Sequence, residues 1–361
     1  MNNILQGDVI EKLKEIETGT VQCVVTSPPY WGLRDYQTAS WEGGDESCDH
    51  SVAKINPLKV GGFTGERLRK EGGTENEKYL KYKNRCSDCG AVKKDQQLGL
   101  EETPEEFVKN LVKVFREVKR VIKDDGTVWL NLGDSYASTK VGNTETKKNP
   151  NVVTKSFTKK LPPNLKTKDL VGIPWRVAFA LQADGWYLRQ DIIWHKPNPM
   201  PESVTDRCTK AHEYIFLLSK SAKYFYNHIS IQEKANYDGR KDTIMKGSEK
   251  YKNSGHTLAA RGHIRWHENE DGIKIRNKRS VWSINTKPYK EAHFAVFPPK
   301  LPELCIKAGS SEGDIVLDPF FGSGTTGWVA QRLGRKWIGI ELNPEYIKIA
   351  ERRFSQKELF A

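Results

Sequence analysis

The sequence predicts an α/β protein built on a doubly wound, mainly parallel sheet. Two short runs, residues 21–25 and 314–317, each read as a buried strand leading into a tight turn rich in proline or glycine. Between them, strand-like segments alternate with segments whose apolar residues recur at helical spacing, as in doubly wound sheets. Because such sheets bind ligands where parallel strands end, the two turns are the first candidates for chemistry.

Composition limits the class of protein. The 361 residues can hold one large α/β domain with an inserted module, or two ordinary domains. The chain carries 58 Lys and Arg against 46 Asp and Glu, a net charge of +12, which favours a polyanionic partner. A lysine-rich soluble protein from an AT-rich genome would show the same excess. There is no signal-peptide pattern or membrane-length apolar run, and six unevenly placed cysteines suit a reducing compartment, so we expect a cytoplasmic protein.

The first elements form a strand, a turn and a helix. They are predicted at residues 4–5, at Gly7 and Asp8, and over residues 9–16. The strand at 21–25 follows. From residue 37 to about 97 the composition changes to Gly, Lys, Glu and Asn with little periodicity, which indicates an insertion.

A helix begins after the insertion. Thr103 is a good N-cap, Pro104 takes the first helical position, and Glu106 completes a capping box. Apolar residues then recur at helical spacing as far as Ile122. The sequence DDG at 124–126 is expected to end the helix, before a strand over residues 127–132.

Two polar stretches interrupt the second half of the chain. Residues 138–168 are rich in Lys, Thr and Asn and predict a long loop, whose lysines would either contact a polyanion or stay solvated. Residues 231–279 are polar, basic and weakly periodic, and Val281 begins the return to the core. The regular elements predicted around these stretches are one helix, 170–183, and three strands, 186–194, 212–218 and one ending at 339–342.

The turn after the first run suits a flat base with an exocyclic amine. Ser27 offers a hydroxyl oxygen and Pro28 a main-chain carbonyl, so two acceptors are available for the two amino hydrogens. Pro28 and Pro29 fix the turn, and Tyr30 supplies a ring on which an extruded base can stack. Accepting both hydrogens lets the nitrogen pyramidalise toward a methyl donor, so alignment and electrostatics suffice without a metal or a covalent nucleophile. A plain structural turn is the alternative.

The turn after the second run suits an adenosine-bearing cofactor. Its sequence, DPFFGSGTT at 318–326, has glycines that allow close approach of the backbone to a ligand and open a helix. Glu341 follows the next strand, at the distance where acidic side chains bind ribose hydroxyls in nucleotide-binding folds. No G-x-x-x-x-G-K-[ST] motif is present, which disfavours a P-loop ATPase.

Together, SPPY near the start and DPFFGSGTT near the end resemble the DNA amino-methyltransferases that use S-adenosylmethionine. The order of the two motifs resembles the β arrangement of that family, over most of the chain outside the insertions. The resemblance implies a Rossmann-like methyltransferase fold and a target-recognition role for the basic stretch after residue 231. The cofactor contacts that it implies are Asp8, His293, Phe294, Phe297, Asp318, Phe320, Gly322, Gly324, Thr325 and Glu341.

Residues 191–198 resemble the strand and loop that flank the target base in this family. His195 in that loop could act as a general base or could simply hold its neighbours. We favour the second interpretation, because amine methylation needs no strong base.

The resemblance implies site-specific methylation of cytosine N4 in double-stranded DNA by base flipping. Ser27 favours cytosine, since adenine-N6 members usually carry Asp or Asn there; adenine N6 is the alternative. RNA or protein-amide methyltransferases are more remote, because they usually place the cofactor motif first. A catalytically silent DNA-binding protein is disfavoured by the intact motifs. A prokaryotic or phage origin is expected, and a homodimer and a cognate restriction nuclease are the further partners considered.

Four cysteine and histidine residues predict a structural zinc site in the insertion. Cys48 and His50 form C-x-H, and Cys86 and Cys89 form C-x-x-C followed by glycine. Two or more thiolates with an imidazole suit tetrahedral zinc. The insertion lacks apolar residues for a core of its own, so metal binding would supply folding free energy. Incidental reduced thiols are the alternative.

The predicted organisation therefore has five segments. Three belong to a catalytic domain, carrying the base motif, the middle strands and the cofactor motif; the other two are a zinc-binding insertion and a target-recognition segment. In chain order they are 1–37 (base motif), 38–99 (zinc insertion), 100–230 (middle part), 231–284 (target recognition) and 285–361 (cofactor binding).

Overall fold

The computed structural model describes residues 2–32, 38–45, 47–50, 85–86, 88–137, 164–235, 267–268, 272–286 and 297–355. The chain divides into two compact units. The larger comprises Met1–Pro28, Val108–Tyr136 and Leu170–Ala361, and the smaller comprises Pro29–Phe107 and Ala137–Asp169. None of the helices within the described ranges is both long and apolar enough to cross a lipid bilayer.

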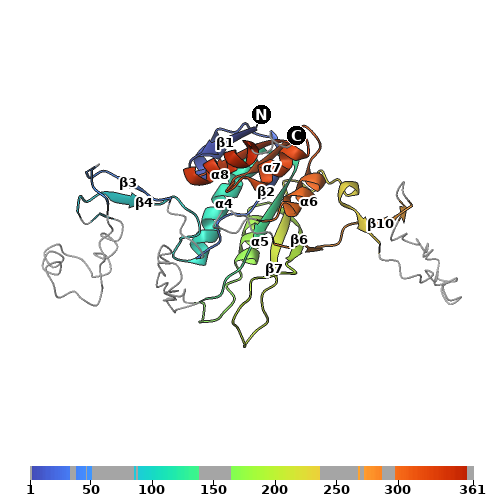
Figure 1. Cartoon of the computed structure of the whole chain (residues 1–361), viewed down its shortest axis with the longest axis horizontal. Coiled ribbons are helices and arrows are strands. Elements are labelled where there is room, and N and C mark those ends of the chain that lie inside the picture. The colour runs from blue at the N-terminus through green and yellow to red at the C-terminus, as the bar shows by residue number, and fades with distance from the viewer. Residues whose placement is uncertain are drawn as a thin grey trace. The chain divides into compact units, whose positions relative to one another are not determined.

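An eight-stranded sheet forms the centre of the larger unit (Figure 1). Every neighbouring pair is parallel except the two pairs that β7 makes, so the predicted mainly parallel sheet is confirmed. In spatial order the strands are β1 (Asn2–Gln6), β13 (Lys336–Glu341), β12 (Ile315–Asp318), β2 (Val21–Thr26), β5 (Ile122–Leu132), β7 (His212–Ser219), β6 (Tyr187–His195) and β11 (Val281–Ser283).

Helices pack on both faces of this sheet, as the side chains of β7 show. Phe216 contacts Trp175 of α5, whereas its neighbours Ile215 and Leu217 belong to the core cluster that includes Leu301 of α6. Successive strand residues point to opposite faces, so α5 and α6 cover opposite sides of β7. The helices are α1 (Val9–Lys14), α4 (Pro104–Val121), α5 (Ile173–Ala183), α6 (Lys300–Gly309), α7 (Thr325–Arg332) and α8 (Pro344–Ser355).

The start of α4 follows the prediction, but its end does not. Thr103 Oγ1 accepts a 3.1 Å hydrogen bond from Glu106 N, as a capping box requires. The predicted DDG break is wrong, because residues 124–126 lie within β5, which begins directly at Ile122. The pairing with β2 is irregular there: Val21 pairs with Ile122 and Cys23 with Thr127, so the additional residues are absorbed as a bulge.

The start of α5 is set by a carboxylate that sequence spacing does not reveal. Helix α5 begins at Ile173 rather than at residue 170. Asp134 Oδ1 accepts hydrogen bonds from Gly172 N at 3.0 Å and Ile173 N at 3.1 Å. This carboxylate, 38 residues earlier in the chain, satisfies N–H groups that a helix leaves open at its first turn.

Small sheets occur outside the main one. In the smaller unit, β3 (Ser40–Glu42) pairs antiparallel with β4 (Val92–Lys94). In the larger unit, η1 (Ile229–Ile231) precedes a sheet of β8 (Glu233–Lys234), β10 (Lys274–Arg276) and β9 (His267–Glu268). Strand β11 joins the main sheet and Trp282 is buried in the main core, so the predicted return to the core at Val281 is confirmed.

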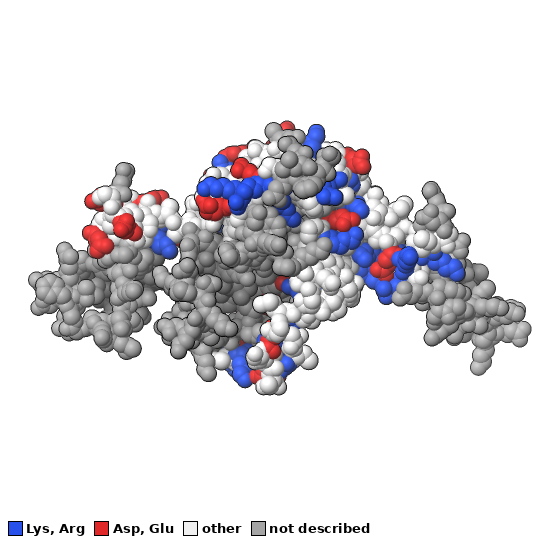
Figure 2. Space-filling model, viewed as in Figure 1, with Lys and Arg blue, Asp and Glu red and all other residues white. Residues whose placement is uncertain are grey.

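Lys and Arg side chains alternate with Asp and Glu over the described surface that Figure 2 shows. The net charge of +12 is therefore not gathered in one patch on the described part of this face. Most of the lysine-rich stretch 138–168 lies outside the described residues.

Candidate active site and metal centre

The cofactor motif and the base motif follow neighbouring parallel strands. β12 ends at Asp318 and its neighbour β2 ends at Thr26, so the turns that start at Pro319 and Ser27 leave the same edge of the sheet. On the other side of β12, β13 ends at Glu341, whose carbonyl accepts a 3.0 Å hydrogen bond from Gly7 N. The predicted residues at these strand ends are thus collected at one edge of the larger unit.

The turn between β12 and α7 is shaped by an aromatic side chain and two glycines. The ring of Phe321 stacks on Trp337 at 5.2 Å, and a Cβ on Gly339 would lie 2.3 Å from that ring. Gly324 has φ of +75° and immediately precedes α7. Gly322 has φ of +52°, and a Cβ there would meet nothing within 4 Å. The backbone at Gly322 therefore borders open space that a ligand can enter.

Glu341 is held by main-chain donors on both of its oxygens. Oε2 accepts a 2.7 Å hydrogen bond from Gly322 N, and Oε1 accepts one of 2.8 Å from Asn343 N. Burial raises the pKa of this carboxyl. Each carboxylate oxygen has a second lone pair, so the group can still accept hydrogen bonds from the two hydroxyls of a ribose.

Asp318 is buried and bonded from three sides. Oδ1 accepts hydrogen bonds from Thr26 Oγ1 at 2.6 Å and from Phe320 N at 3.0 Å. Oδ2 accepts one of 2.7 Å from Thr326 Oγ1, which also lies 3.2 Å from the carbonyl oxygen of Val25. Burial raises the pKa of Asp318 to about 7. The carboxyl thus connects the end of the base strand to both ends of the cofactor turn.

The base motif spans the division between the two units. Ser27 is half-buried and Pro28 buried at the end of β2, in the larger unit. In the smaller unit, a Cβ on Gly99 would lie 2.9 Å from the carbonyl oxygen of Tyr30, and Gly32 N donates a 2.8 Å bond to Gly99 O. The residues around Gly99 therefore hold the chain directly after Pro29 and Tyr30.

The other residues predicted to contact the cofactor lie in different parts of the structure. Asp8 caps α1, its Oδ1 accepting from Ile10 N at 2.9 Å. Thr325 Oγ1 accepts from Arg353 Nη1 at 2.8 Å, and Phe297 packs against the main core. His293 and Phe294 lie outside the described residues.

The structure brings the four predicted metal ligands together in the smaller unit. The ligand atoms of Cys48, His50, Cys86 and Cys89 all lie within 4.8 Å of one another. The sulfurs of Cys48 and Cys86 are 3.7 Å apart, and Cys89 Sγ is 3.3 Å from His50 Nδ1. A zinc ion with thiolate bonds of about 2.3 Å places two sulfurs of a tetrahedron about 3.8 Å apart, so the spacing fits the metal.

Local structure builds this cluster and favours thiolates. Strand β3 precedes Cys48 and strand β4 follows Cys89, so the antiparallel pairing of the two strands brings the two ligand pairs together. The main-chain N–H of Cys89 lowers the pKa of Cys86 to about 6, and the N–H groups of Asp45 and Ala91 lower that of Cys89. The main-chain N–H of His50 lowers the pKa of Cys48, but burial and the neighbouring thiols of Cys86 and Cys89 outweigh it and raise that pKa to about 11. Zinc binds the deprotonated sulfur, so the main-chain donors prepare two of the three thiols for a cation.

Comparison with known proteins identifies the family. The model of the N6/N4 DNA methylase family matches residues 21–352. The chain belongs to this DNA methylase family. The Type II methyltransferase M.XycI of Xanthomonas campestris pv. cyanopsidis is 41% identical over 353 residues, covering 98% of this chain and 87% of the relative. M.SmaI of Serratia marcescens, also a Type II methyltransferase, is 41% identical over 355 residues, which cover 98% and 91%.

Solved structures agree on the fold. The PvuII DNA methyltransferase, described as cytosine-N4-specific, superposes with a TM-score of 0.56 at 18% identity, covering 98% of this chain and 86% of that one. A Thermus thermophilus protein solved in complex with S-adenosyl-L-methionine has a TM-score of 0.50 at 20% identity, covering 99% and 95%. At these identities the likeness establishes the methyltransferase fold alone.

In this DNA methylase polar contacts hold the end of β6 and the residue that follows it. His195 Nδ1 lies 3.0 Å from Ser283 Oγ. Lys196 pairs with Glu213, and its ammonium lies 4.4 Å above the ring of Trp194. His195 is thus the last residue of β6 rather than part of the predicted loop, and its contact with Ser283 supports a positioning role.

Three residues of the methylase site were not singled out from the sequence. Thr26 precedes the base motif and Thr326 is the last residue of the cofactor motif, and nothing in local spacing shows that they share the carboxylate of Asp318. Gly99 was placed at the boundary of the insertion, although its φ of +94° and its contact with Tyr30 give it a specific place. Their positions in or beside the motifs were the available signal.

Proposed function

We propose that this methylase transfers a methyl group from S-adenosylmethionine to the exocyclic N4 of cytosine in double-stranded DNA. The observation that carries the proposal is the placement of Ser27 and Asp318 at the ends of neighbouring parallel strands, joined through Thr26. This geometry sets a base-binding turn beside a cofactor turn, as methyl transfer between two flat ligands requires.

The cofactor turn supplies the contacts for S-adenosylmethionine. Glu341 offers acceptors for ribose hydroxyls, and the open backbone at Gly322 allows close approach of the ligand. Asp8, at the end of the neighbouring strand, lies on the same edge of the sheet for contact with the adenine. When bound, the cofactor supplies an electrophilic methyl group.

The base motif prepares the amine for attack. Ser27 Oγ and the Pro28 carbonyl accept the two amino hydrogens, and Tyr30 stacks on the extruded ring. Held in this way, the lone pair of the amine nitrogen would face the electrophilic methyl group that the bound cofactor would supply. The proton that the methylated amine must lose would pass by way of these acceptors to water, without need of a strong base.

Cytosine is favoured over adenine by Ser27. The structural relative from the PvuII system, described as cytosine-N4-specific, supports this choice. Methylation of adenine N6 is the second candidate, because the family model covers both reactions.

The Cys48, His50, Cys86 and Cys89 cluster is proposed to hold one structural zinc ion. The matching sulfur spacing and the lowered thiol pKa values of Cys86 and Cys89 support it. By analogy with its Type II bacterial relatives, we place the enzyme in a bacterial cytoplasm, where a cognate nuclease would be its functional partner.

Radiolabelled S-adenosylmethionine tests the substrate class. The purified chain is incubated with the labelled cofactor in three separate reactions, which contain duplex DNA, RNA or a ribosomal extract. Label on DNA that disappears in a Ser27→Ala variant supports the proposal. Label on RNA or protein instead would assign the chain to another substrate class, and no transfer with intact DNA binding would make it a silent binding protein.

A further inference from the structure

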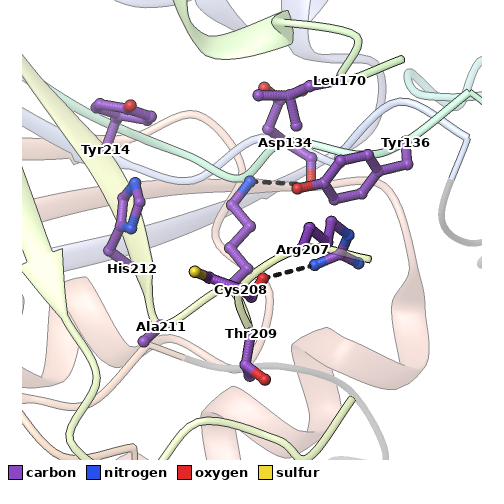
Figure 3. A pocket seen from close by; sticks show the side chains of 10 residues that line it. Asp134, Tyr136, Leu170, Arg207, Cys208, Thr209, Ala211, His212 and Tyr214 are labelled. Carbon is purple, nitrogen blue, oxygen red and sulfur yellow. Dashed lines mark hydrogen bonds between the residues drawn. The ribbon is translucent and has the colours of Figure 1, made fainter. Parts of the chain in front are cut away.

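An open cavity of about 390 Å³ lies in the larger unit, formed by residues other than the base and cofactor motifs (Figure 3). Its lining comes from the chain after β5, from the loop that leads into α5 and from the approach to β7. The lining residues used below are Tyr136, Leu170, Arg207, Lys210, His212 and Tyr214.

The cavity lies at the same edge of the sheet as Ser27, one strand away. Thr26 at the end of β2 pairs with Leu130 of the adjacent β5, and Asp134 follows where β5 leaves the sheet. Strand β7 is antiparallel, so its first residue, His212, lies at this same edge. The cavity and Ser27 therefore lie at one edge of the sheet, on neighbouring strand ends.

Lys210 faces the cavity, and its ammonium makes no ion pair within the described part of the chain. Its half-buried ammonium donates a 3.3 Å hydrogen bond to the carbonyl oxygen of Asp134. Among the residues that the structure describes, no carboxylate lies within ion-pair distance of Lys210 Nζ. Burial lowers the pKa of this ammonium, as expected for a cation removed from water without a full partner. The carboxylates of Asp134, Glu213 and Glu202 act on the ammonium from a greater distance and offset this shift only in part. An anion in the cavity would add the direct partner that Nζ lacks.

Arg207, the other cation that lines the cavity, already has an ion-pair partner and an aromatic ring beside its guanidinium. Its Nη1 donates to Glu202 Oε2 at 2.6 Å, and its guanidinium lies 4.0 Å over the ring of Tyr136. Glu202 Oε2 also lies 3.4 Å from Lys210 N, so the same carboxylate orders the loop that carries both cations. Of the two cations, Lys210 is therefore the one whose N–H groups have fewer partners among the described residues.

A second lysine at the opposite end of β7 provides a comparison. Lys220 Nζ also contacts a main-chain carbonyl, that of Ile122 at 3.2 Å. Unlike Lys210, it has a carboxylate partner, Asp124, at 2.8 Å. Lys220 follows the last residue of β7, at the edge of the sheet away from Ser27.

We propose that Lys210 binds a backbone phosphate of the DNA and that the cavity beside it receives the sugar of the same nucleotide. A phosphate diester offers oxygens to an ammonium that has few acceptors, and the rings of Tyr136, His212 and Tyr214 offer apolar surface to a deoxyribose. The inference rests on the proposed function, since it takes DNA as the substrate. It adds a second contact point to the nucleotide held by Ser27.

The salt dependence of DNA binding tests the proposal. Binding of a fluorescent duplex to the full chain is measured by anisotropy over a series of salt concentrations, for the wild type and for Lys210→Met, Lys210→Arg and Lys220→Met. Lys210→Met should weaken binding equally for any sequence and reduce the slope of log K against log salt by about 0.9, the value for one lost phosphate contact. Lys210→Arg should keep the slope, and Lys220→Met should match the wild type.

The outcomes separate this inference from the proposed function. A wild type that methylates DNA, with an unchanged slope in Lys210→Met, overturns the phosphate site alone. An equal decrease of the slope in Lys220→Met also overturns it, because the effect would then come from the lower net charge of the protein and not from a phosphate contact of Lys210. A wild type that neither binds nor methylates DNA would contradict both the phosphate site and the proposed function. Retained S-adenosylmethionine affinity and thermal melting in Lys210→Met exclude misfolding as the cause of a lower slope.

Discussion

Thr26 Oγ1 donates a 2.6 Å hydrogen bond to Oδ1 of Asp318, across 292 positions of sequence. Thr26 is the last residue of β2, directly before Ser27, and Asp318 is the last residue of β12, directly before the cofactor turn. Thr326 donates to the other oxygen of the same carboxyl. Base motif and cofactor motif are therefore fixed to each other through one buried group.

Breaking this link should slow methyl transfer. Thr26→Val and Thr326→Val each remove a hydroxyl donor from a buried carboxyl, at a cost of about 1–3 kcal/mol. We expect kcat to fall more than cofactor affinity, because the alignment of the two sites is what the hydroxyls fix. Combining the two changes should give a non-additive result, since both act on Asp318.

Thr20→Val is the matched control for that pair. Thr20 directly precedes β2, at the opposite end from Thr26, and its hydroxyl makes a local hydrogen bond to Glu17 O. Steady-state kinetics should show nearly unchanged kcat. Equal losses in Thr20→Val and Thr26→Val would show that the link has no special role in catalysis.

The two motifs should divide the work between base and cofactor. Ser27→Ala or Tyr30→Ala should nearly abolish methyl transfer and leave S-adenosylmethionine affinity largely intact, because these residues serve the base. Asp318→Ala should weaken cofactor binding first, since it removes the group that holds the cofactor turn. Isothermal titration with the cofactor alone separates these effects. Loss of cofactor affinity in Ser27→Ala as large as the loss of activity would contradict the division.

Asp318 should make stability depend on pH in an unusual direction. Burial raises its pKa from 3.8 to about 7, so the native state binds a proton more tightly than the unfolded chain does. Stability therefore falls as the pH rises from about 4 to about 7 and stays lower above it. In Asp318→Asn this contribution is absent.

Melting temperatures at about pH 5 and about pH 8 check the sign. The advantage of the wild type over Asp318→Asn should be larger at the acidic pH. Glu341, whose pKa is also raised by burial, remains in both proteins and so cancels in the comparison. A larger advantage at the alkaline pH would mean that Asp318 is stabilised as a carboxylate.

The Cys and His cluster should contain about one zinc ion per chain. Cys86→Ser should release the metal and loosen the pairing of β3 with β4, with an indirect loss of activity, while cofactor binding in the larger unit survives. Cys208→Ser is the control, because Cys208 is exposed and outside the cluster. Elemental analysis of protein never exposed to chelator measures the content; a metal-free active enzyme would refute the zinc site.

The features that local sequence patterns encode could be predicted from the sequence. The strand over 21–25, the capping box at Thr103 and the two ligand pairs of the metal cluster each follow from residues close together in the chain, and the structure places them as expected. The start of β5 at Ile122 did not follow, because a bulge against β2 overrides the DDG turn signal.

Contacts between distant segments lay beyond such reasoning. The carboxylate of Asp134 sets the start of α5, and Thr26 meets Asp318, only because the sheet brings separate strands to one edge. Lys210 likewise carries no motif, and its lack of a carboxylate partner within the described part of the chain depends on how the loop before β7 folds.

The identity of the methylated nucleoside tests the central claim most directly. Duplex DNA treated with the wild-type enzyme and S-adenosylmethionine is digested to nucleosides and analysed by mass spectrometry, with Ser27→Ala as the inactive control. We predict N4-methylcytosine, present with the wild type and absent with the variant. N6-methyladenine in its place would contradict the assignment of cytosine, and unmodified DNA from an enzyme that binds the cofactor would contradict the proposed function itself.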